Sequence, residues 1–221
     1  GVNESTNVVN LMPGTYYIKV YRWTGYGSYS ISSTFTPASL ANDETTNDTP
    51  DQSSTLAYNG SDTGHLGFYK AGYTDLEDWW KVTIPADGKL LVSTESDATL
   101  EIDLYTHELN SGNYVNIKGY DIGSGVNEST NVVNLIAGTY YIKVYRWTGY
   151  GSYTIRSVFT PARYANDPEV NDSLETAAPL QVNTGETGHL SYYAAGYTDT
   201  HDWYAFTVPA SWDSLFVRIM S

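Results

Sequence analysis

The chain is built from one sequence unit that recurs at a fixed spacing. Residues 1–38 return as residues 125–162 with five substitutions, an offset of 124 residues and no gap. The same offset carries residues 41–86 onto residues 165–210, where about half of the positions are identical. A unit of about 124 residues has the size of a small all-β domain. The sequence therefore predicts a tandem array of similar domains.

The repeat divides the chain into five parts. Residues 1–37 are expected to be the C-terminal part of a first β-sandwich repeat, and residues 47–161 a complete repeat. Residues 171–221 are expected to be the N-terminal part of a third repeat. The polar, acidic segments 38–46 and 162–170 join these parts, so we interpret them as linkers between domains.

Apolar and polar residues alternate with period two along the complete repeat. Trp80, Val82 and Ile84 share one face of a segment, as do Tyr140, Ile142 and Val144 of another. This pattern, with turn signals every 8–12 residues, predicts an all-β, jelly-roll-like antiparallel sandwich. Residues 85–88 (Pro-Ala-Asp-Gly) are expected to form a turn in which Gly88 supplies a positive φ. The predicted strands are residues 63–68, 79–84, 90–96, 100–105, 114–120, 131–135, 139–147 and 152–159.

The composition excludes several classes of function. With 11 basic and 25 acidic residues, the net charge is −14, and nucleic acid is a poor partner for such a chain because phosphate binding needs clustered Lys and Arg. The chain has no cysteine, which rules out disulfides and thiolate metal sites. No apolar run is long enough to span a membrane in this segment.

The sequence also gives little support for catalysis. It contains no His-Glu-x-x-His, Gly-x-Ser-x-Gly or phosphate-loop motif, and we expect no enzymatic activity. His65 and His189 recur in Thr-Gly-His-Leu without further His or Cys ligands beside them. A hydrogen bond made by each ring is the favoured interpretation, ahead of metal binding.

Several motifs, in order and spacing, resemble a known family. They are Asn47-Asp48, Asp75-x-x-Asp78-Trp79-Trp80, the run Ala-Gly-Thr-Tyr-Tyr-Ile-Lys-Val-Tyr at 137–145, and Gly149-x-Gly151-x-Tyr153. The chain is similar to the bacterial pre-peptidase C-terminal (PPC) domain, and residues 145–153 look most like the collagen-binding domains of clostridial collagenases. The resemblance implies a non-catalytic, jelly-roll-like sandwich, either appended to secreted proteases or repeated in surface proteins. It implies an extracellular or cell-surface location.

Calcium is the cofactor that this resemblance implies, because some family members bind it where the entering linker meets the loop before the Asp-Trp strand. Oxygen-rich side chains suit such a hard cation. The alternative is that these residues only cap turns. The residues nominated are Asn47, Asp48, Asp75 and Asp78 in the complete repeat, and Glu169, Asn171, Asp172, Asp199 and Asp202 in the third.

Two other residue sets are candidates for binding or modification. Aromatic residues beside a Lys- and Arg-bearing strand are suited to stacking on sugars or gripping a peptide ligand, although packing against the sandwich or the next repeat is the favoured alternative. The aromatic candidates are Tyr145, Trp147 and Tyr150, with Tyr21, Trp23 and Tyr26 in the first repeat. The Asn-x-Ser/Thr triplets that are candidates for glycosylation in a secretory context begin at Asn3, Asn47, Asn59, Asn127 and Asn171.

These observations leave two hypotheses for the function. The first is a structural and adhesive module in which calcium-stiffened sandwiches are strung in series, with other copies of the chain as partners. In one version, late strands in residues 1–37 pair with early strands in residues 166–221 of another copy and build a head-to-tail filament. The alternative is a targeting module that brings a secreted hydrolase to collagen-like protein or polysaccharide.

Overall fold

The computed structural model describes residues 10–42, 46–70, 72–120, 127–129, 133–164, 171–194, 196–208, 210 and 214–220. These residues form strands, turns and two short 3-10 helices, η1 (Pro50–Gln52) and η2 (Leu174–Thr176). None of them is α-helical, which confirms the all-β prediction. Within this part of the chain no helix has the length and apolar character needed to cross a membrane.

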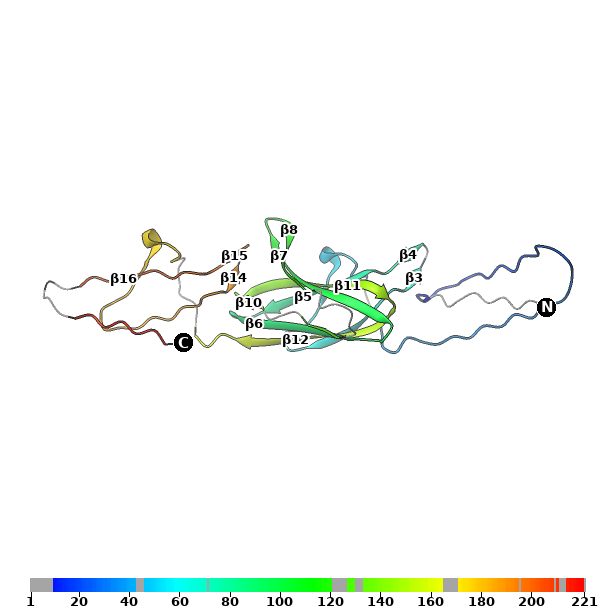
Figure 1. Ribbon diagram of the computed structural model, residues 1–221, viewed down its shortest axis with the longest axis horizontal. Helices are drawn as coiled ribbons and strands as arrows, with labels where there is room; N and C mark the ends of the chain where they lie inside the picture. Colours follow the sequence, from blue (N-terminus) through cyan, green and yellow to red (C-terminus); the bar gives the residue numbers. More distant parts are fainter. Residues whose placement is uncertain are drawn as a thin grey trace.

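Two sheets form the central sandwich (Figure 1). The first has the strand order β1-β5-β11-β7-β8, and the second has the order β15-β14-β10-β6-β12-β2, with β9 also paired to β6. The strands of the first sheet are β1 (Ser54–Thr55), β5 (Glu77–Ile84), β11 (Gly138–Gly149), β7 (Leu100–Asn110) and β8 (Asn113–Tyr120). Those of the second are β15 (Tyr197–Thr198), β14 (Tyr193–Ala194), β10 (Val133–Leu135), β6 (Gly88–Ser96), β12 (Gly151–Pro161), β2 (Ser61–Leu66) and β9 (Asn127–Ser129).

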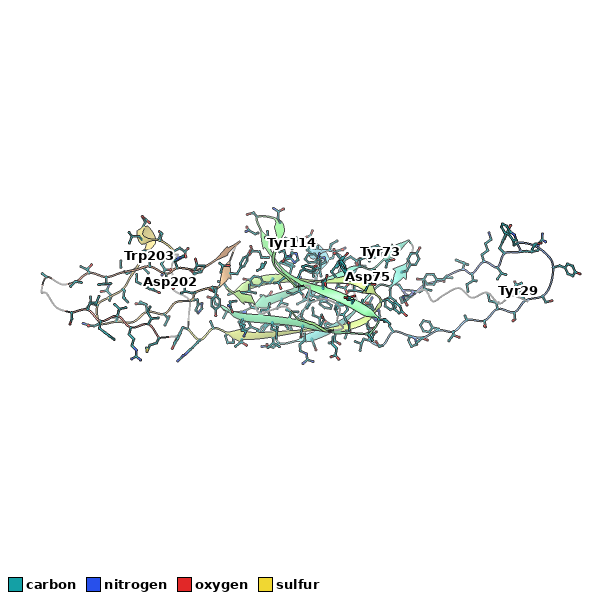
Figure 2. All side chains as sticks on the ribbon, viewed as in Figure 1. Tyr29, Tyr73, Asp75, Tyr114, Asp202 and Trp203 are labelled. Atoms are coloured by element: carbon teal, nitrogen blue, oxygen red, sulfur yellow. The ribbon has the colours of Figure 1, made fainter. Side chains whose placement is uncertain are left out.

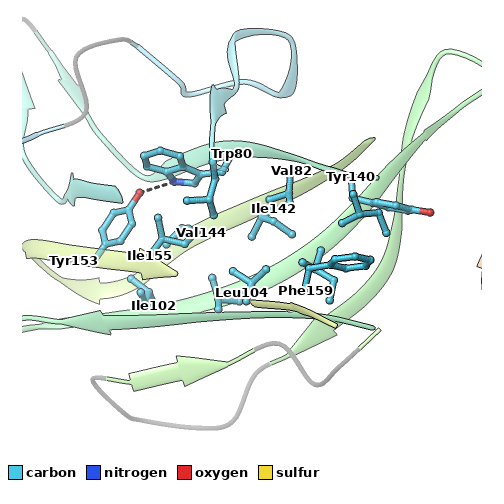
Figure 3. Close-up of a cluster of buried hydrophobic side chains, with 14 of the residues drawn as sticks. Trp80, Val82, Ile102, Leu104, Tyr140, Ile142, Val144, Tyr153, Ile155 and Phe159 are labelled. Carbon is cyan, nitrogen blue, oxygen red and sulfur yellow. Dashed lines mark hydrogen bonds between the residues drawn. The ribbon is translucent and has the colours of Figure 1, made fainter. Parts of the chain in front are cut away.

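The core lies between the two sheets (Figure 3). Trp80, Val82 and Ile84 of β5 are buried, and so are Tyr140, Ile142 and Val144 of β11, which confirms both faces expected from the alternation. Leu90 and Val92 of β6, and Ile155 and Phe159 of β12, cover them from the second sheet. Burial of these side chains is the main favourable contribution to folding of the sandwich.

The predicted strands are found close to their expected positions, with one extension. β7 continues to Asn110, five residues beyond its expected end at Tyr105, because it pairs on one side with β11 and on the other with β8. The hairpin from β7 to β8 turns at Ser111 and Gly112, with φ of 51° and 80°. Positive φ at both central residues matches the twist of a two-residue hairpin.

The prediction that Gly88 supplies a positive φ was wrong. Gly88 does not have a positive φ. A Cβ atom there would lie 2.4 Å from the Thr160 carbonyl oxygen and 2.6 Å from the Phe159 ring. Glycine is therefore required because the neighbouring strand β12 approaches too closely for any side chain.

Segments on either side of the sandwich extend from its opposite ends (Figure 1). In the preceding segment, Ile18, Val20, Ile31 and Phe35 are exposed, by 53 to 86%. Their counterparts one offset later, Ile142, Val144, Ile155 and Phe159, are buried in the core. The described residues thus close one sandwich, in the complete repeat, and closed sandwiches on either side of it stay a prediction.

The segment after the sandwich repeats the early pairings of the complete repeat. β13 (Ala178–Pro179) runs parallel to β16 (Tyr204–Ala205), with Ala178 opposite Tyr204. One offset earlier, Ser54 of β1 is opposite Trp80 of β5. Likewise β14 pairs with β15 as β3 (Tyr69–Lys70) pairs with β4 (Tyr73–Thr74). The repeated sequence therefore directs the same local pairings.

Candidate functional site

The start of the complete repeat, directly after the entering linker, lies against strand β5. The Trp79 amide, in β5, donates a 2.7 Å hydrogen bond to the Asn47 carbonyl oxygen. The Asn47 side chain is only 2% exposed. The chain therefore folds back onto β5 as it enters the repeat, and this brings Asn47 and Asp48 next to the acidic residues that begin the strand.

The loop before β5 holds the second acidic position. The β3–β4 hairpin lies within this loop, and its two ends are tied together by backbone hydrogen bonds of 2.9 Å, from Gly67 to the Asp75 carbonyl and from Asp75 to the Phe68 carbonyl. Asp75 is 4% exposed. Figure 2 shows Asp75 and Tyr73 together at the end of the sandwich from which the preceding segment extends.

Three of the predicted ligands converge at this point. One carboxylate oxygen from each of Asp48, Asp75 and Asp78 lies within 4.8 Å of the other two. Asp75 and Asp78 are buried, with Asp78 only 1% exposed, while Asp48 is half-buried. Asp48, which is 27 or more positions from the other two in the sequence, thus joins them in one compact group of carboxylates.

Asp78 is fixed in this group by the core. Its Oδ2 accepts a hydrogen bond from the Tyr153 hydroxyl of β12, and that hydroxyl accepts a 2.9 Å bond from the Trp80 indole Nε1 (Figure 3). A Cβ on Gly64 would lie 2.5 Å from the Tyr153 hydroxyl oxygen, so glycine at that position leaves room for the phenol. The carboxylate therefore depends on strands from both sheets.

The pKa of Tyr73 is shifted by burial and by the same carboxylates. Burial, followed by the negative charges of Asp48 and Asp75 and a hydrogen bond to Asp48, raises the pKa of the Tyr73 hydroxyl to about 12. The hydroxyl is thus neutral at physiological pH and is available as a hydrogen-bond donor to the carboxylates.

The donor set fits a hard divalent cation. Calcium binds oxygen ligands at about 2.3–2.6 Å, so oxygens on opposite sides of one ion are about 5 Å apart, and the 4.8 Å cluster meets that limit. Buried like charges are costly unless a cation or protons neutralise them. The Asn47 Nδ2 is buried without a hydrogen-bond partner, but an amide N–H group cannot bind a cation, so the fit rests on the carboxylate oxygens.

The third repeat keeps part of this arrangement. The Trp203 amide donates a 2.7 Å bond to the Asn171 carbonyl, as Trp79 does to Asn47. Asn171 is buried, whereas Asp172, Asp199 and Asp202 are half-buried. Asp202 and Trp203 lie in the segment beyond the sandwich (Figure 2). Among the described residues these acids do not form a three-carboxylate group like that of the complete repeat, and Glu169 lies outside the described residues.

The predicted aromatic ligand residues are largely exposed. Trp147 is 67% exposed and Tyr150 39%, while Tyr145 is half-buried. Their counterparts Tyr21, Trp23 and Tyr26 are exposed on the preceding segment. Arg146 is half-buried, and its Nε donates a hydrogen bond to the Gly149 carbonyl.

An inner aromatic group on the same sheet surrounds one lysine. The Lys143 Nζ lies 4.9 Å from the Tyr105 ring centroid, 5.3 Å from that of Tyr145 and 5.7 Å from that of Trp79. Trp79 is only 6% exposed and packs against His107, with ring centroids 4.9 Å apart. Trp79 is therefore a packing residue of the outer sheet face.

Both repeated histidines make hydrogen bonds to the linkers. The His65 Nε2 lies 2.6 Å from the Leu40 carbonyl oxygen, and the His189 Nε2 donates in the same way to the Tyr164 carbonyl. Since a carbonyl can only accept, Nε2 carries the proton in each ring. The favoured interpretation as hydrogen-bonding residues is confirmed.

The glycosylation candidates differ in their surroundings. Asn59 is exposed, although its Oδ1 accepts a 2.6 Å bond from the Phe159 amide. The Nδ2 atoms of Asn47 and Asn171, to which a glycan would be attached, are buried. Asn3 lies outside the described residues, as does the side chain of Asn127.

Comparison with known proteins identifies the central repeat. Residues 76–146 match the family model of the bacterial pre-peptidase C-terminal domain. The resemblance inferred from the sequence motifs is therefore confirmed for this part of the chain. No curated protein sequence matches the chain.

Solved structures that match the chain cover about half of it. The pre-peptidase C-terminal domain of collagenase from Bacillus anthracis is 20% identical, with a TM-score of 0.38, over 48% of this chain and 93% of that chain. CorA of Methylomicrobium album BG8, a surface-associated copper-binding protein, is 9% identical, with a TM-score of 0.35, over 49% of this chain and 98% of that chain.

Sequence reasoning did not single out two residues of the site, Tyr73 and Tyr153. A signal was present for both, since Tyr73 precedes the acidic loop in a Gly-Tyr-Thr-Asp run that recurs at Tyr197, and Tyr153 recurs from Tyr29. Neither recurrence indicates that the hydroxyl faces a carboxylate, because that contact joins residues far apart in the sequence.

His107 makes the stability of the sandwich depend on pH. Burial, together with the positive charge of Lys143, lowers the pKa of the His107 imidazole to about 4, below the ordinary value of about 6.5. As the pH falls from 6.5 towards 4, the unfolded chain takes up this proton and the folded chain does not, so stability decreases. In urea titrations at pH 7 and pH 4.5, His107→Phe should lose less stability between the two pH values than the unsubstituted chain. Equal losses would contradict this assignment.

Proposed function

We propose that the chain is a non-catalytic, calcium-binding β-sandwich module of a secreted or cell-surface protein, repeated in series. The observation that carries the proposal is the group formed by Asp48, Asp75 and Asp78, which joins the entering linker to the core. The match of residues 76–146 to the pre-peptidase C-terminal family supports both the module type and the location outside the cell.

In this proposal the chain's own residues do the positioning. Tyr153 holds Asp78 in place, the paired ends of the β3–β4 loop hold Asp75, and the linker presents Asp48. A bound cation supplies the positive charge that offsets repulsion among the three carboxylates. Because Asp48 lies two residues after the entering linker, binding ties the end of that linker to the sandwich and limits its motion.

Burial of the site favours a structural role over a catalytic one. Asp75 and Asp78 are nearly fully buried, and a catalytic metal needs a position open to water or substrate. The cluster also lacks an adjacent His among the described residues that could act as a general base. A cation here would stabilise the fold without exposing a reactive face.

Asp48→Asn tests the calcium proposal. Calcium should raise the melting temperature of the unsubstituted chain by several degrees, because the ion binds only the folded state. In Asp48→Asn that rise should be nearly lost, while in chelator the variant should be at least as stable as the parent, because one of three mutually repelling charges is gone. The exposed Asp62→Asn serves as the matched control. A calcium response that Asp48→Asn leaves intact would overturn the site.

We further propose that the segments flanking the sandwich are completed by complementary strands from neighbouring repeats, including those of a second copy of the chain. The exposure of Ile18 and Phe35, whose counterparts are core residues, supports this assignment. The two segments together lack counterparts of residues 98–124, so further strands must cover the remaining core of such a reassembled unit.

Sedimentation velocity tests assembly between copies. The chain should form oligomers that grow with concentration and shrink in Ile18→Asp, because Ile18 corresponds to the buried Ile142. The adjacent Tyr17→Asp, at a position corresponding to the outward-facing Tyr141, should leave assembly unchanged. A single monomeric species for the unsubstituted chain at every concentration would exclude this part of the proposal.

A second candidate function is substrate targeting, and the exposure of Trp147 favours it. A large aromatic side chain that is 67% exposed is suited to stacking on sugar rings or on an extended peptide. The collagenase that contains a similar domain suggests collagen-like protein as one class of ligand, and polysaccharide is the other.

Co-sedimentation with insoluble collagen and with insoluble polysaccharides tests the targeting function. If the chain binds either material, Trp147→Ala should weaken binding by about tenfold or more, the usual effect of removing a central aromatic anchor. Trp203→Ala, which removes an exposed indole from another part of the chain, is the control. Absence of binding to all of the materials would leave the structural role as the better account.

A further inference from the structure

Two places in the molecule, one repeat length apart, make the same contact between consecutive repeats. Leu11 of the first repeat forms a parallel bridge with Tyr69 of the second. Leu135 of the second repeat pairs in parallel with Tyr193 of the third. Both residues of the pair move by the same offset of 124, so the boundary is built in the same way on either side of the complete repeat.

The hydrogen bonds at the two boundaries also correspond. The Met12 amide donates to the Tyr69 carbonyl at 3.1 Å, and the Ile136 amide donates to the Tyr193 carbonyl at 3.3 Å. Each boundary histidine is hydrogen-bonded to a backbone carbonyl of the preceding linker. The partner of His65 is the Leu40 carbonyl, and the partner of His189 is the carbonyl of Tyr164, one offset later.

An aromatic ring stacks on the histidine at each boundary. The ring centroids of His65 and Phe68 are 4.9 Å apart, and those of His189 and Tyr192 are 4.4 Å apart. One constellation, consisting of a histidine, a stacked aromatic residue and a bridging tyrosine, thus contacts the repeat that precedes it in both places.

The boundary between the complete repeat and the third repeat shows which residues contact this constellation. The Tyr193 hydroxyl donates a 2.9 Å bond to Glu108 Oε1 of β7, and the Tyr193 ring packs against the hydrophobic core of the complete repeat. Asp87 Oδ1 accepts a 2.7 Å bond from the Ala137 amide, while its Oδ2 lies 3.6 Å from the His189 Nδ1. Burial and the bond to Glu108 raise the pKa of Tyr193 to about 12, which keeps its hydroxyl a donor.

From these contacts we propose that each repeat carries a docking plug at its start and a matching socket at its end, and that the partner of the socket is the plug of the following repeat. The plug is His189, Tyr192 and Tyr193, and its earlier counterpart is His65, Phe68 and Tyr69. The socket is defined by Asp87, Glu108, Leu135 and Tyr164. The proposal rests on the tandem organisation within the proposed function, and adds the surface through which the repeats interact.

This docking makes the repeat boundary a continuation of the sandwich. β14 and β15 of the third repeat extend the second sheet beyond β10, and the sheet reaches seven strands only with them. Because plug and socket are different surfaces, the contact is heterologous and can propagate along an array of any length. The boundary is therefore a fixed joint that sets the orientation of consecutive repeats, whereas the linker composition alone indicates a flexible connection.

Hydrogen exchange of the full chain, followed residue by residue by NMR, tests the joint. The reporter is the Ile136 amide, which donates across the boundary, and the internal reference is the Val144 amide in β11. In the double variant His189→Ala/Tyr193→Ala, the Ile136 amide should exchange about tenfold faster or more because its partner strand is released, while Val144 should keep its rate.

His201→Ala/Tyr17→Ala, at two exposed positions that make none of the boundary contacts described above, is the matched control and should change neither rate. An Ile136 amide that exchanges at the same rate in the plug variant as in the parent would overturn the joint. The measurement is made with calcium and with chelator. If the unsubstituted chain shows no calcium-dependent rise in melting temperature but its Ile136 amide is protected, the metal site alone is contradicted. If the rise is present but the Ile136 amide is unprotected in that chain, the joint alone is contradicted.

Discussion

The hydrogen bond between the Tyr153 hydroxyl and the buried Asp78 carboxylate is the interaction on which the arrangement of this molecule depends. The same Tyr153 hydroxyl accepts a hydrogen bond from the Trp80 indole N–H. Tyr153 belongs to one sheet and Trp80 to the other, so this short chain of hydrogen bonds crosses the core and ends at the acidic cluster. A carboxylate that is 1% exposed is tolerated only when it is hydrogen-bonded and neutralised. Tyr153 supplies the hydrogen bond, and the proposed cation would neutralise the charge.

Contacts between distant residues hold both ends of the repeat. Asp48 can join Asp78 only if the entering linker folds back onto β5, which the bond from the Trp79 amide to the Asn47 carbonyl enforces. At the other end, Tyr193 of the following repeat continues the sheet beside β10 and bonds Glu108. Both sets of contacts hold a boundary of the complete repeat, the first at its start and the second at its end.

Much of the sandwich could be predicted from the sequence, because alternation reports which face of a strand is buried. Residues 80, 82 and 84 and residues 140, 142 and 144 were placed on the buried faces for this reason. The three carboxylates came from the family resemblance and not from spacing. Contacts between distant residues could not be predicted. Neither the bond from Tyr153 to Asp78 nor the pairing of Leu135 with Tyr193 leaves a local pattern, and the requirement for Gly88 arises from the approach of β12.

Anomalous diffraction from crystals of the full chain grown with calcium tests the central claim most directly. The account predicts an anomalous peak at about 2.3–2.6 Å from a carboxylate oxygen of each of Asp48, Asp75 and Asp78, with Tyr153 still bonded to Asp78. A well-ordered cluster in saturating calcium that has no anomalous peak and contains only water between the carboxylates would contradict it.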